Sequence, residues 1–283
     1  MSVPAFQDIS KSANDLLNKD FYHLSAGTIE VKSNTPNNVA FKVTGKSSHE
    51  KATSGNLEGK YSDKSLGLTL TQTWTTANTI ESKVELADSI AKGLKAEGVF
   101  SFLPAAQSKG AKLNLTFKQS AFHGRAYFDL LKGPTANVDA VIGHEGFVAG
   151  ASAGYDVQRA AVTGYSAAVG FQAPSYSAAV TATDNLSVFA ASYYHKVNSQ
   201  VEAGAKATWN SKSGNTVGLE VASKYRLDPV SFAKAKINDR GVAAVSYNVL
   251  LRPGVTLGLG ASFDTQKLEQ ATHKVGTSFT FES

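Results

Sequence analysis

Lysine side chains in this sequence stand at alternate positions of short segments, beside apolar residues of the opposite parity. In AKLNLTFKQ (111–119), Lys112 and Lys118 share one face of an extended chain with polar residues, and Leu113 and Leu115 occupy the other face. Rows of cationic side chains raise the concentration of anions in the water beside them. The chemistry that this spacing predicts is electrostatic selection among ions, which requires no bond-making group.

Residues that perform covalent or metal chemistry are not grouped in the sequence. The chain has no cysteine, which excludes disulfides, thiolate nucleophiles and cysteine metal sites. Its six histidines are dispersed without HExxH or other metal-ligand spacing, and no GxSxG elbow occurs. His144 and Glu145 lie in a GHEG turn, where a solvated pair is expected instead of a catalytic dyad. We therefore predict no enzyme, no cofactor and no metal.

The charge balance is modestly basic. There are 28 Lys plus Arg against 23 Asp plus Glu, which gives a formal charge of +5 and favours anionic partners. The basic residues are dispersed, and no aromatic and basic cluster forms a platform for stacking bases. Nucleic acid is excluded as a partner on these grounds.

The elements that would position these lysines are β-strands. Beyond the N-terminal segment the apolar residues alternate with a period of two, and turn fragments such as SNTPNN and INDRG separate the segments. We count about nineteen strands of about nine to twelve residues, the length of tilted transmembrane strands. The clearest are 39–46, 67–74, 82–88, 94–102, 122–130, 201–209, 216–225, 255–263 and 273–281. So many hairpin-linked strands leave unpaired edges unless the sheet closes, which predicts a barrel over 25–283.

The apolar face of such a sheet could contact either lipid or the core of a soluble protein. No run approaches 18 apolar residues, so a chain that crosses a membrane would have to do so as a closed barrel. Aromatic residues near strand ends on the apolar side fit an interfacial girdle: Trp74, Trp209, Tyr61, Tyr225 and Phe263. Lipid is the predicted solvent, because no helical layer covers this face. A soluble β-rich binding protein is the alternative, since the rim of a sandwich also collects aromatic residues.

Residues 1–24 form a separate N-terminal unit of helix and linker. Apolar residues recur there at spacings of three and four: Phe6, Ile9, Ala13, Leu16 and Leu17. This stripe predicts one amphipathic helix over about residues 5–20, with Asp15 and Lys19 as an i,i+4 ion pair. The same stripe would suit a helix that lies on the membrane surface.

The polar parity of each strand defines the predicted lumen face. The pore-lining and selectivity residues that we assign to the helix and to this face are Lys11, Asp15, Lys19, Lys46, Lys60, Lys83, Lys95, Lys112, Arg125, Lys224, Lys234, Lys236 and Lys274. Further basic positions are Lys42, Lys118, Lys206 and Arg226, and the acidic positions are Glu58, Glu81, Glu85, Glu97, Asp129, Glu202 and Glu220. The basic excess predicts a weak preference for hydrated anions, acting within a Debye length of about 8 Å.

Three stretches are distinctive: VPAFQDISKSANDLLNKDFYH near the N-terminus, GLK at 93–95, and YRLDPVSFAKAKINDRGVAAVSY at 225–247. Together they resemble the voltage-dependent anion channel, the porin of the mitochondrial outer membrane. The resemblance covers essentially the whole chain and is strongest to fungal members. The final KVGTSFTF also resembles the sorting signal of barrels in that membrane.

The resemblance implies a voltage-gated, weakly anion-selective diffusion channel that passes small ions and metabolites such as ATP and ADP. It implies a nineteen-stranded barrel with parallel first and last strands and the helix inside the lumen. That strand number is known for the family, so our count agrees with it and is no independent discovery. The narrowest section lies beside the helix, which favours Lys11, Lys19, Lys95 and Lys236 as its charges, with weak nucleotide contact at Lys19 and Lys95.

The resemblance also implies partners. These are membrane lipids and sterol, nucleotides and other metabolite anions in transit, further copies of the chain in a homo-oligomer, and a docked cytosolic kinase. Gln72 departs from the lipid-facing glutamate of animal relatives, and this departure argues against carrying the kinase over. The alternative within this barrel type is the protein-import channel of the same membrane, which carries a longer N-terminal extension.

Overall fold

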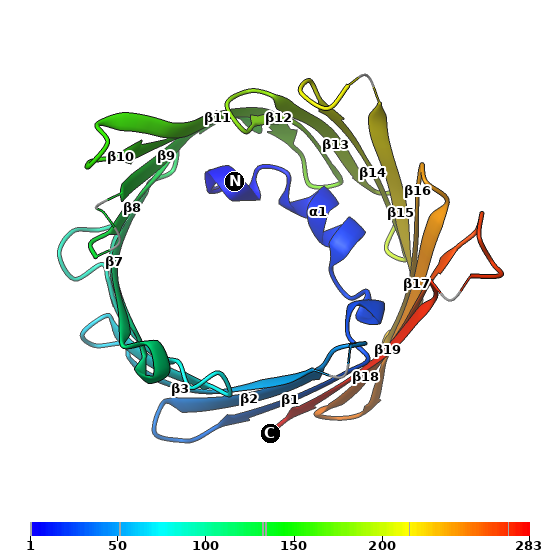
Figure 1. The fold of residues 1–283 in the computed structure, drawn as a ribbon, viewed down its shortest axis with the longest axis horizontal. Coiled ribbons are helices and arrows are strands. Elements are labelled where there is room, and N and C mark those ends of the chain that lie inside the picture. The colour runs from blue at the N-terminus through cyan, green and yellow to red at the C-terminus, as the bar shows by residue number, and fades with distance from the viewer. Residues whose placement is uncertain (1, 51, 132, 134, 215, 271) are drawn as a thin grey trace.

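The computed structural model describes residues 2–50, 52–131, 133, 135–214, 216–270 and 272–283, and it shows a ring of strands around one N-terminal segment (Figure 1). The ring is a single 19-stranded sheet. Each strand pairs with its neighbour in sequence in antiparallel fashion, and a parallel pairing of β1 with β19 closes the ring. The prediction of an all-β barrel of about nineteen strands is confirmed.

The strand bounds lie within a few residues of those predicted from alternation. The strands are β1 (Gly27–Asn34), β2 (Val39–Ser47), β3 (Thr53–Asp63), β4 (Leu68–Thr75), β5 (Ile80–Ala87), β6 (Leu94–Leu103), β7 (Ser108–Lys118), β8 (Phe122–Asp129), β9 (Thr135–His144), β10 (Phe147–Asp156), β11 (Ala161–Gln172), β12 (Tyr176–Thr183), β13 (Val188–Lys196), β14 (Val201–Asn210), β15 (Val217–Asp228), β16 (Ser231–Asn238), β17 (Val242–Arg252), β18 (Val255–Asp264) and β19 (Lys274–Glu282). A short 3-10 turn, η3 (Pro104–Ala106), joins β6 to β7.

The N-terminal segment is not the single helix that the apolar stripe predicts over residues 5–20. It contains a 3-10 turn η1 (Phe6–Asp8), an α-helix α1 (Lys11–Asn18) and a second 3-10 turn η2 (Tyr22–Leu24). The break between η1 and α1 lets each part follow the curved wall. Within the described residues, no helix is long and apolar enough to cross a bilayer.

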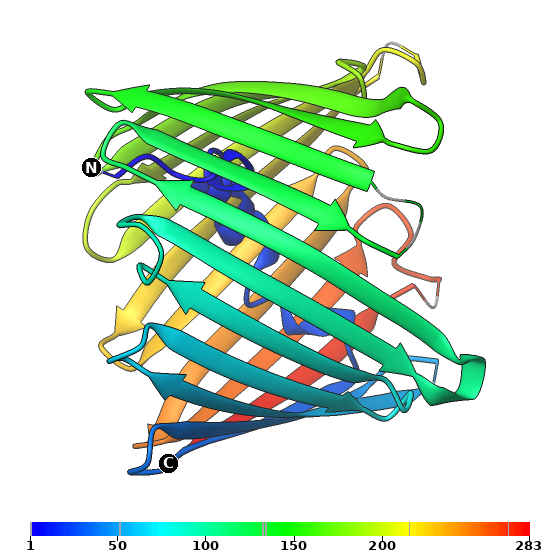
Figure 2. The ribbon, with the colours of Figure 1, turned by 90° about the vertical axis from the view of Figure 1, so that its left-hand side faces the viewer.

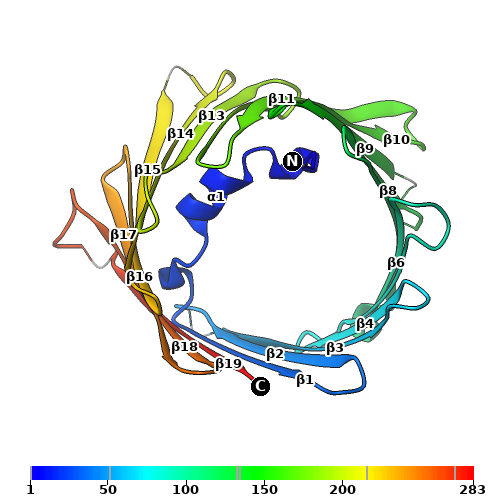
Figure 3. The same cartoon turned by 180° about the vertical axis from the view of Figure 1, so that it is seen from behind.

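The segment lies inside the ring and runs along one side of it. Its parts contact β9 and β10 (η1), β13 to β15 (α1), and β18 and β19 (η2). Both end-on views show it beside these strands and away from β3 to β7 (Figures 1 and 3). Seen from the side, the strands are tilted and both chain ends lie toward the same end of the barrel (Figure 2).

The outer face of the ring is apolar and uncovered. Trp74 is 57% exposed, Ile142 62% and Val169 56%, and these side chains belong to the parity opposite to the one that contacts the N-terminal segment. Burying apolar area stabilises a protein by about 25 cal/mol per Å², so a surface of this kind requires a lipid environment. The aromatic residues Tyr61, Trp209 and Tyr225 share this outer face near strand ends, as a girdle at the membrane interface requires.

Candidate functional site

The strand register determines which side chains face the lumen. Residues directly opposite each other in paired strands share a face, and the wall face that contacts the N-terminal segment is the inner one. Lys236, for example, lies opposite Ala222, which packs on the segment. Following the pairs around the ring places every predicted basic position on this inner face: Lys42, Lys46, Lys60, Lys83, Lys95, Lys112, Lys118, Arg125, Lys206, Lys224, Arg226, Lys234, Lys236 and Lys274.

Sequence reasoning missed several charged residues on the inner face. Glu30 and Lys32 lie there on β1, and Asp139, Lys196 and Glu282 lie there on β9, β13 and β19. The alternation in TIEVKS was a sufficient signal for Glu30 and Lys32. Asp139 lies in a strand rich in small residues, where parity is hard to assign from sequence.

Two lysines and two glutamates form a compact ionic cluster on β5 and β6. Lys83 lies 2.9 Å from Glu85 and 3.1 Å from Glu97, and Lys95 lies 2.7 Å from Glu85 and 3.4 Å from Glu97. The formal charge of the four groups sums to zero. Lys95 therefore faces the lumen as predicted, but its charge is largely compensated by its neighbours.

A second ionic group reinforces the parallel seam of the barrel. Glu30 on β1 pairs with Lys42 of β2 at 3.0 Å and with Lys32 at 2.9 Å, and Lys32 reaches Glu282 of β19 at 2.7 Å. The group therefore spans the one parallel contact in the ring. Parallel pairing is slightly less stable per residue than antiparallel pairing, so these side-chain contacts support the seam.

Arg125 is also paired on the inner wall. Its guanidinium makes a bidentate interaction with Asp139 on β9, with nitrogen-to-oxygen distances of 2.8 to 3.1 Å. The side chains are 12% and 7% exposed. Because a buried bidentate pair satisfies both partners, Arg125 adds little free positive charge to the lumen.

The N-terminal segment presents its apolar stripe to the wall, and its charged residues face the lumen water. Ile9 packs with Val141, Val148, Ala168 and Ala179 of β9 to β12. On α1, Leu16 and Leu17 pack on Ala222, with Tyr194 beside them. Lys11 and Lys19 are exposed, and Asp15 is half-buried.

The ion pair on α1 differs from the predicted one. Asp15 pairs with Lys11 at 3.3 Å, one turn before it, and not with Lys19. Lys19 is the C-cap residue and has an extended backbone, so its side chain leaves the helical surface on which an i,i+4 pair would form.

Glycines of the inner wall allow the N-terminal segment to approach the strands closely. A Cβ at Gly204 would lie 2.9 Å from the Leu16 side chain, and one at Gly170 would lie 3.1 Å from Ile9. At Gly276 a Cβ would collide with the carbonyl oxygens of Tyr22 and Ser25. Side chains at these positions would push the segment away from the wall.

The predicted departure at Gln72 lies on the outer face. Gln72 is opposite Ser82 of β5, whose hydroxyl donates to Gln72 Oε1 at 2.6 Å. An uncharged amide with a hydrogen-bond partner is far cheaper to expose to lipid than a carboxylate.

The GLK stretch forms a turn. Gly93 has φ +85°, a conformation that favours glycine, and its N–H donates to Asp88 Oδ1 at 2.6 Å. Its carbonyl accepts from the Lys118 N–H, so both backbone groups are already used and no phosphate cradle is formed.

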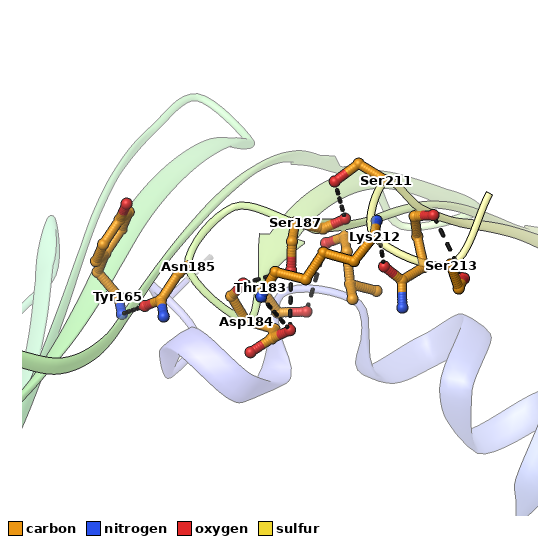
Figure 4. Close-up of polar contacts among 10 residues, drawn as sticks. Tyr165, Thr183, Asp184, Asn185, Ser187, Ser211, Lys212 and Ser213 are labelled. Carbon is orange, nitrogen blue, oxygen red and sulfur yellow. Dashed lines mark hydrogen bonds and ion pairs between the residues drawn. The ribbon is translucent and has the colours of Figure 1, made fainter. Parts of the chain in front are cut away.

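Polar contacts tie neighbouring turns together at one rim of the barrel (Figure 4). The Lys212 ammonium lies 3.1 Å from Asp184, and the Ser187 hydroxyl donates to the same carboxylate at 2.9 Å. These two donors, Ser187 first, hold the pKa of Asp184 below its usual range. The contacts connect the β12–β13 turn to the β14–β15 turn and lie outside the charged inner wall.

No arrangement for covalent or metal chemistry appears in the described part of the chain. Groups of three or more histidine and acidic side chains that could hold a metal ion are absent from the described residues. His144 and Glu145 are 3.7 Å apart in an exposed turn, with side chains 89% and 82% exposed. A pair so open to water is a solvated contact, as the sequence predicted.

Comparison with known proteins shows similarity over the full length. A family model described as "Eukaryotic porin" matches residues 2–276. The chain is 82% identical to the mitochondrial outer membrane protein porin of Neurospora crassa, with all of both chains covered. It is 41% identical to the non-selective voltage-gated ion channel 1 of Saccharomyces cerevisiae, again with all of both chains covered. A solved structure of a mutant Rh. blastica porin matches with a TM-score of 0.52 at 10% identity, over 80% of this chain and 89% of that one, and shows likeness of fold alone.

Proposed function

The chain belongs to the eukaryotic porin family, and we propose that the exposed lysines of its inner wall give it a weak preference for anions. It is a voltage-gated diffusion channel of the mitochondrial outer membrane, through which small ions and metabolites pass, and it is not an enzyme. The import-channel alternative is not supported, because the matching relatives are named as porins and ion channels. A soluble binding protein does not fit the apolar outer face of a closed barrel.

The observation that carries the proposal is the difference between compensated and uncompensated charges on the inner wall. Lys46 and Lys60 are exposed, and their ammonium groups have no hydrogen bond or ion pair among the described residues, unlike the charged groups of Lys83, Lys95 and Arg125. Uncompensated charges dominate the potential in a wide, water-filled lumen. We assign the preference mainly to the exposed members of the predicted set: Lys19, Lys46, Lys60, Lys112 and Lys274. Lys11 is exposed too, but Asp15 compensates its charge at 3.3 Å, so its contribution is smaller.

Nucleotides respond to the same potential more strongly than chloride, because they carry several charges. Lys19 is an exposed residue at the C-terminal end of α1 and is the better candidate for transient phosphate contact. Lys95 is the weaker candidate, since Glu85 lies 2.7 Å from its ammonium. Contact at either position would be brief, because the Lys19 side chain is exposed to the lumen and Lys95 is already paired with glutamates.

The partners beyond ions and metabolites follow from the outer face. Membrane lipids cover it, and an open groove beside Val43, Leu57 and Trp74 is a candidate seat for an apolar lipid such as a sterol. Self-association of barrels through this face is a further proposal. Kinase docking through a lipid-facing carboxylate is not expected, since Gln72 carries no charge there.

The test is the zero-current potential of the refolded protein in a planar bilayer that separates unequal KCl concentrations. The proposal expects weak chloride preference at low voltage, and partial closure as voltage of either sign increases. Lys19→Glu should shift the preference toward cations, and Lys95→Glu should do so through the carboxylate that it adds to the β5–β6 cluster. Unchanged preference in both variants would contradict the residue assignment. Absence of channels from folded, inserted protein would contradict the channel itself.

A further inference from the structure

Two lysines of the inner wall face the end of α1 and not the open lumen. Lys234 and Lys236 occupy successive inward positions of β16 and are called here the β16 lysine pair. The Lys234 ammonium donates to the carbonyl of Lys19 at 2.6 Å and to that of Asp15 at 3.2 Å. The Lys236 ammonium donates to the carbonyl of Leu17 at 2.9 Å.

The carbonyls of Leu17 and Lys19 lie at the end of α1, whereas the Asp15 carbonyl already accepts the Lys19 N–H. The last four C=O groups of a helix lack intrahelical donors and carry a partial negative charge. In α1 the carbonyls of Leu17 and of the C-cap Lys19 belong to this end. The β16 lysine pair satisfies both with cationic donors, which make stronger hydrogen bonds than neutral ones.

The surroundings of the pair show that these lysines make specific structural contacts and are not two solvated side chains. Lys234 is only 4% exposed. Both ammonium groups lie over the Phe21 ring, that of Lys234 at 4.9 Å and that of Lys236 at 4.8 Å from its centroid, within cation–π range. Among the described residues neither ammonium has a carboxylate within ion-pair distance, so backbone carbonyls and one aromatic face are its recorded partners.

The wall beside the pair matches the helix end in shape. The neighbours of Lys236 on the adjoining strands are Ala222 and Ala244, which are 2% and 1% exposed. Leu17 of α1 is fully buried over this surface. Small side chains therefore let the end of α1 reach the wall. The lysine pair holds that end at one position along β16 and in one orientation.

We propose that Lys234 and Lys236 are positioning residues of the channel, which hold α1 against the wall and so keep the lumen open. Their charges act on helix carbonyls and contribute little to anion preference. This assigns them a role different from that of the exposed lumen lysines. It extends the channel function and does not depend on which of those lysines governs selectivity.

The test compares two variants that each remove two lysine charges from the inner face. One is K234M/K236M, and the matched control is K46M/K60M on β2 and β3, whereas α1 contacts β13 to β15. Both are made in an Ala13→Cys background. The chain has no cysteine of its own, and Ala13 is 2% exposed on the wall side of α1, so labelling by a maleimide reports whether the helix leaves the wall.

For K234M/K236M we expect roughly tenfold faster labelling of Cys at position 13, as local opening becomes frequent. We also expect flickering transitions to lower conductance, with little change in zero-current potential. For K46M/K60M we expect a shift of zero-current potential toward cations and unchanged labelling. The reverse pattern, selectivity lost and labelling unchanged in K234M/K236M, would overturn the proposal.

An arginine variant and a single substitution serve as controls for misfolding of the double methionine variant. In K234R/K236R the guanidinium groups still donate to the carbonyls, so labelling and conductance should return to those of the parent. Labelling as fast as in the methionine variant would overturn the proposal. If K234M/K236M does not insert, K236M alone decides the same question, because Lys236 is less buried than Lys234.

Discussion

Two regions of the inner face are built from the same kind of alternating strand, but they contact different neighbours. Along β2 to β8 the inner face carries lysines, glutamates and threonines that contact water, and this region is called here the water side. Along β9 to β12 it carries mostly glycine, alanine, serine and valine, with Asp139 among them, and the N-terminal segment covers it. The segment continues over β13 to β15 and over β18 and β19, and this whole region is called here the covered side. The inner face is therefore polar where it contacts water. Where it contacts the N-terminal segment it is mostly small or apolar, and Lys234 and Lys236 are exceptions.

The same difference separates the electrostatic roles of lysines. On the water side, charges are either compensated in clusters such as that of Glu85 and Glu97 or left exposed as at Lys46. On the covered side, Lys234 and Lys236 are directed at backbone carbonyls. A residue's position on the lumen face is thus insufficient to assign it a role in ion selection; its partners decide.

The largest effect is expected when a buried side chain is removed between the N-terminal segment and the covered side. Leu17→Ala removes a side chain that is 0% exposed between α1 and the wall. Truncation of a buried leucine costs about 2 to 5 kcal/mol. The thermal transition of the detergent-refolded protein should fall, and open-state current should become noisier. Ser12→Ala, at an exposed position of the same helix, should change neither; an equal loss in both variants would contradict the packing account.

A smaller loss is expected when the covered wall gains a side chain. Gly276→Ala places a methyl group against the carbonyls of Tyr22 and Ser25, so η2 must shift. Overpacking of this kind costs about 1 to 3 kcal/mol. The matched control is Gly45→Ala on the outer face of β2, where a Cβ would meet nothing within 4 Å. The midpoint of the thermal transition should fall for Gly276→Ala alone, and a similar fall for Gly45→Ala would show that strand glycines matter for another reason.

Alternation was sufficient to predict the strands and the inward parity of the lysines. It failed on the covered side, where stretches such as AGASAGYD alternate glycine and serine with alanine, residues of similar size and polarity. The structure places Gly150 and Ser152 inward and Ala151 outward, because the N-terminal segment needs room there. Physical partners distant in sequence, and not local pattern, decide such positions.

Distant partners also explain what could not be predicted about the candidate site. The break between η1 and α1 follows the curvature of a wall that the first 24 residues do not encode. The role of Lys236 depends on the carbonyl of Leu17, a partner 219 residues away. The register places Lys95 on the inner face, but its compensation by Glu85 and Glu97 depends on the pairing of β5 with β6, which the sequence pattern does not give.

The role of charge compensation on the water side can be tested by removing the two carboxylates of the β5–β6 cluster. Glu85→Gln with Glu97→Gln leaves Lys83 and Lys95 without carboxylate partners and should increase chloride preference. A unit charge acts on an ion 8 Å away in water with about 0.5 kcal/mol, so a roughly twofold change in permeability ratio is expected. Lys83→Met with Lys95→Met should shift the zero-current potential in the opposite direction. Shifts of the same sign in both variants would contradict the pairing.

The smallest effect concerns pH on the covered side. His23 of η2 is 6% exposed, and its Nδ1 has no hydrogen-bond partner. Burial, and then the charges of Lys236, Lys274 and His49, lower the pKa of His23. The neutral imidazole is therefore the form that the seated segment favours.

Because the pKa of His23 is lower in the seated segment than in the free one, the free segment binds more protons just below pH 6.5. The stability that His23 contributes is thus complete above about pH 6.5 and declines as the pH falls below it. The thermal midpoint should fall between pH 7.5 and pH 5.5 by more in the parent than in His23→Gln, which does not titrate. Equal falls in the two proteins would place the pH dependence in other groups, and the covered side would then owe its stability to packing and to the lysine contacts alone.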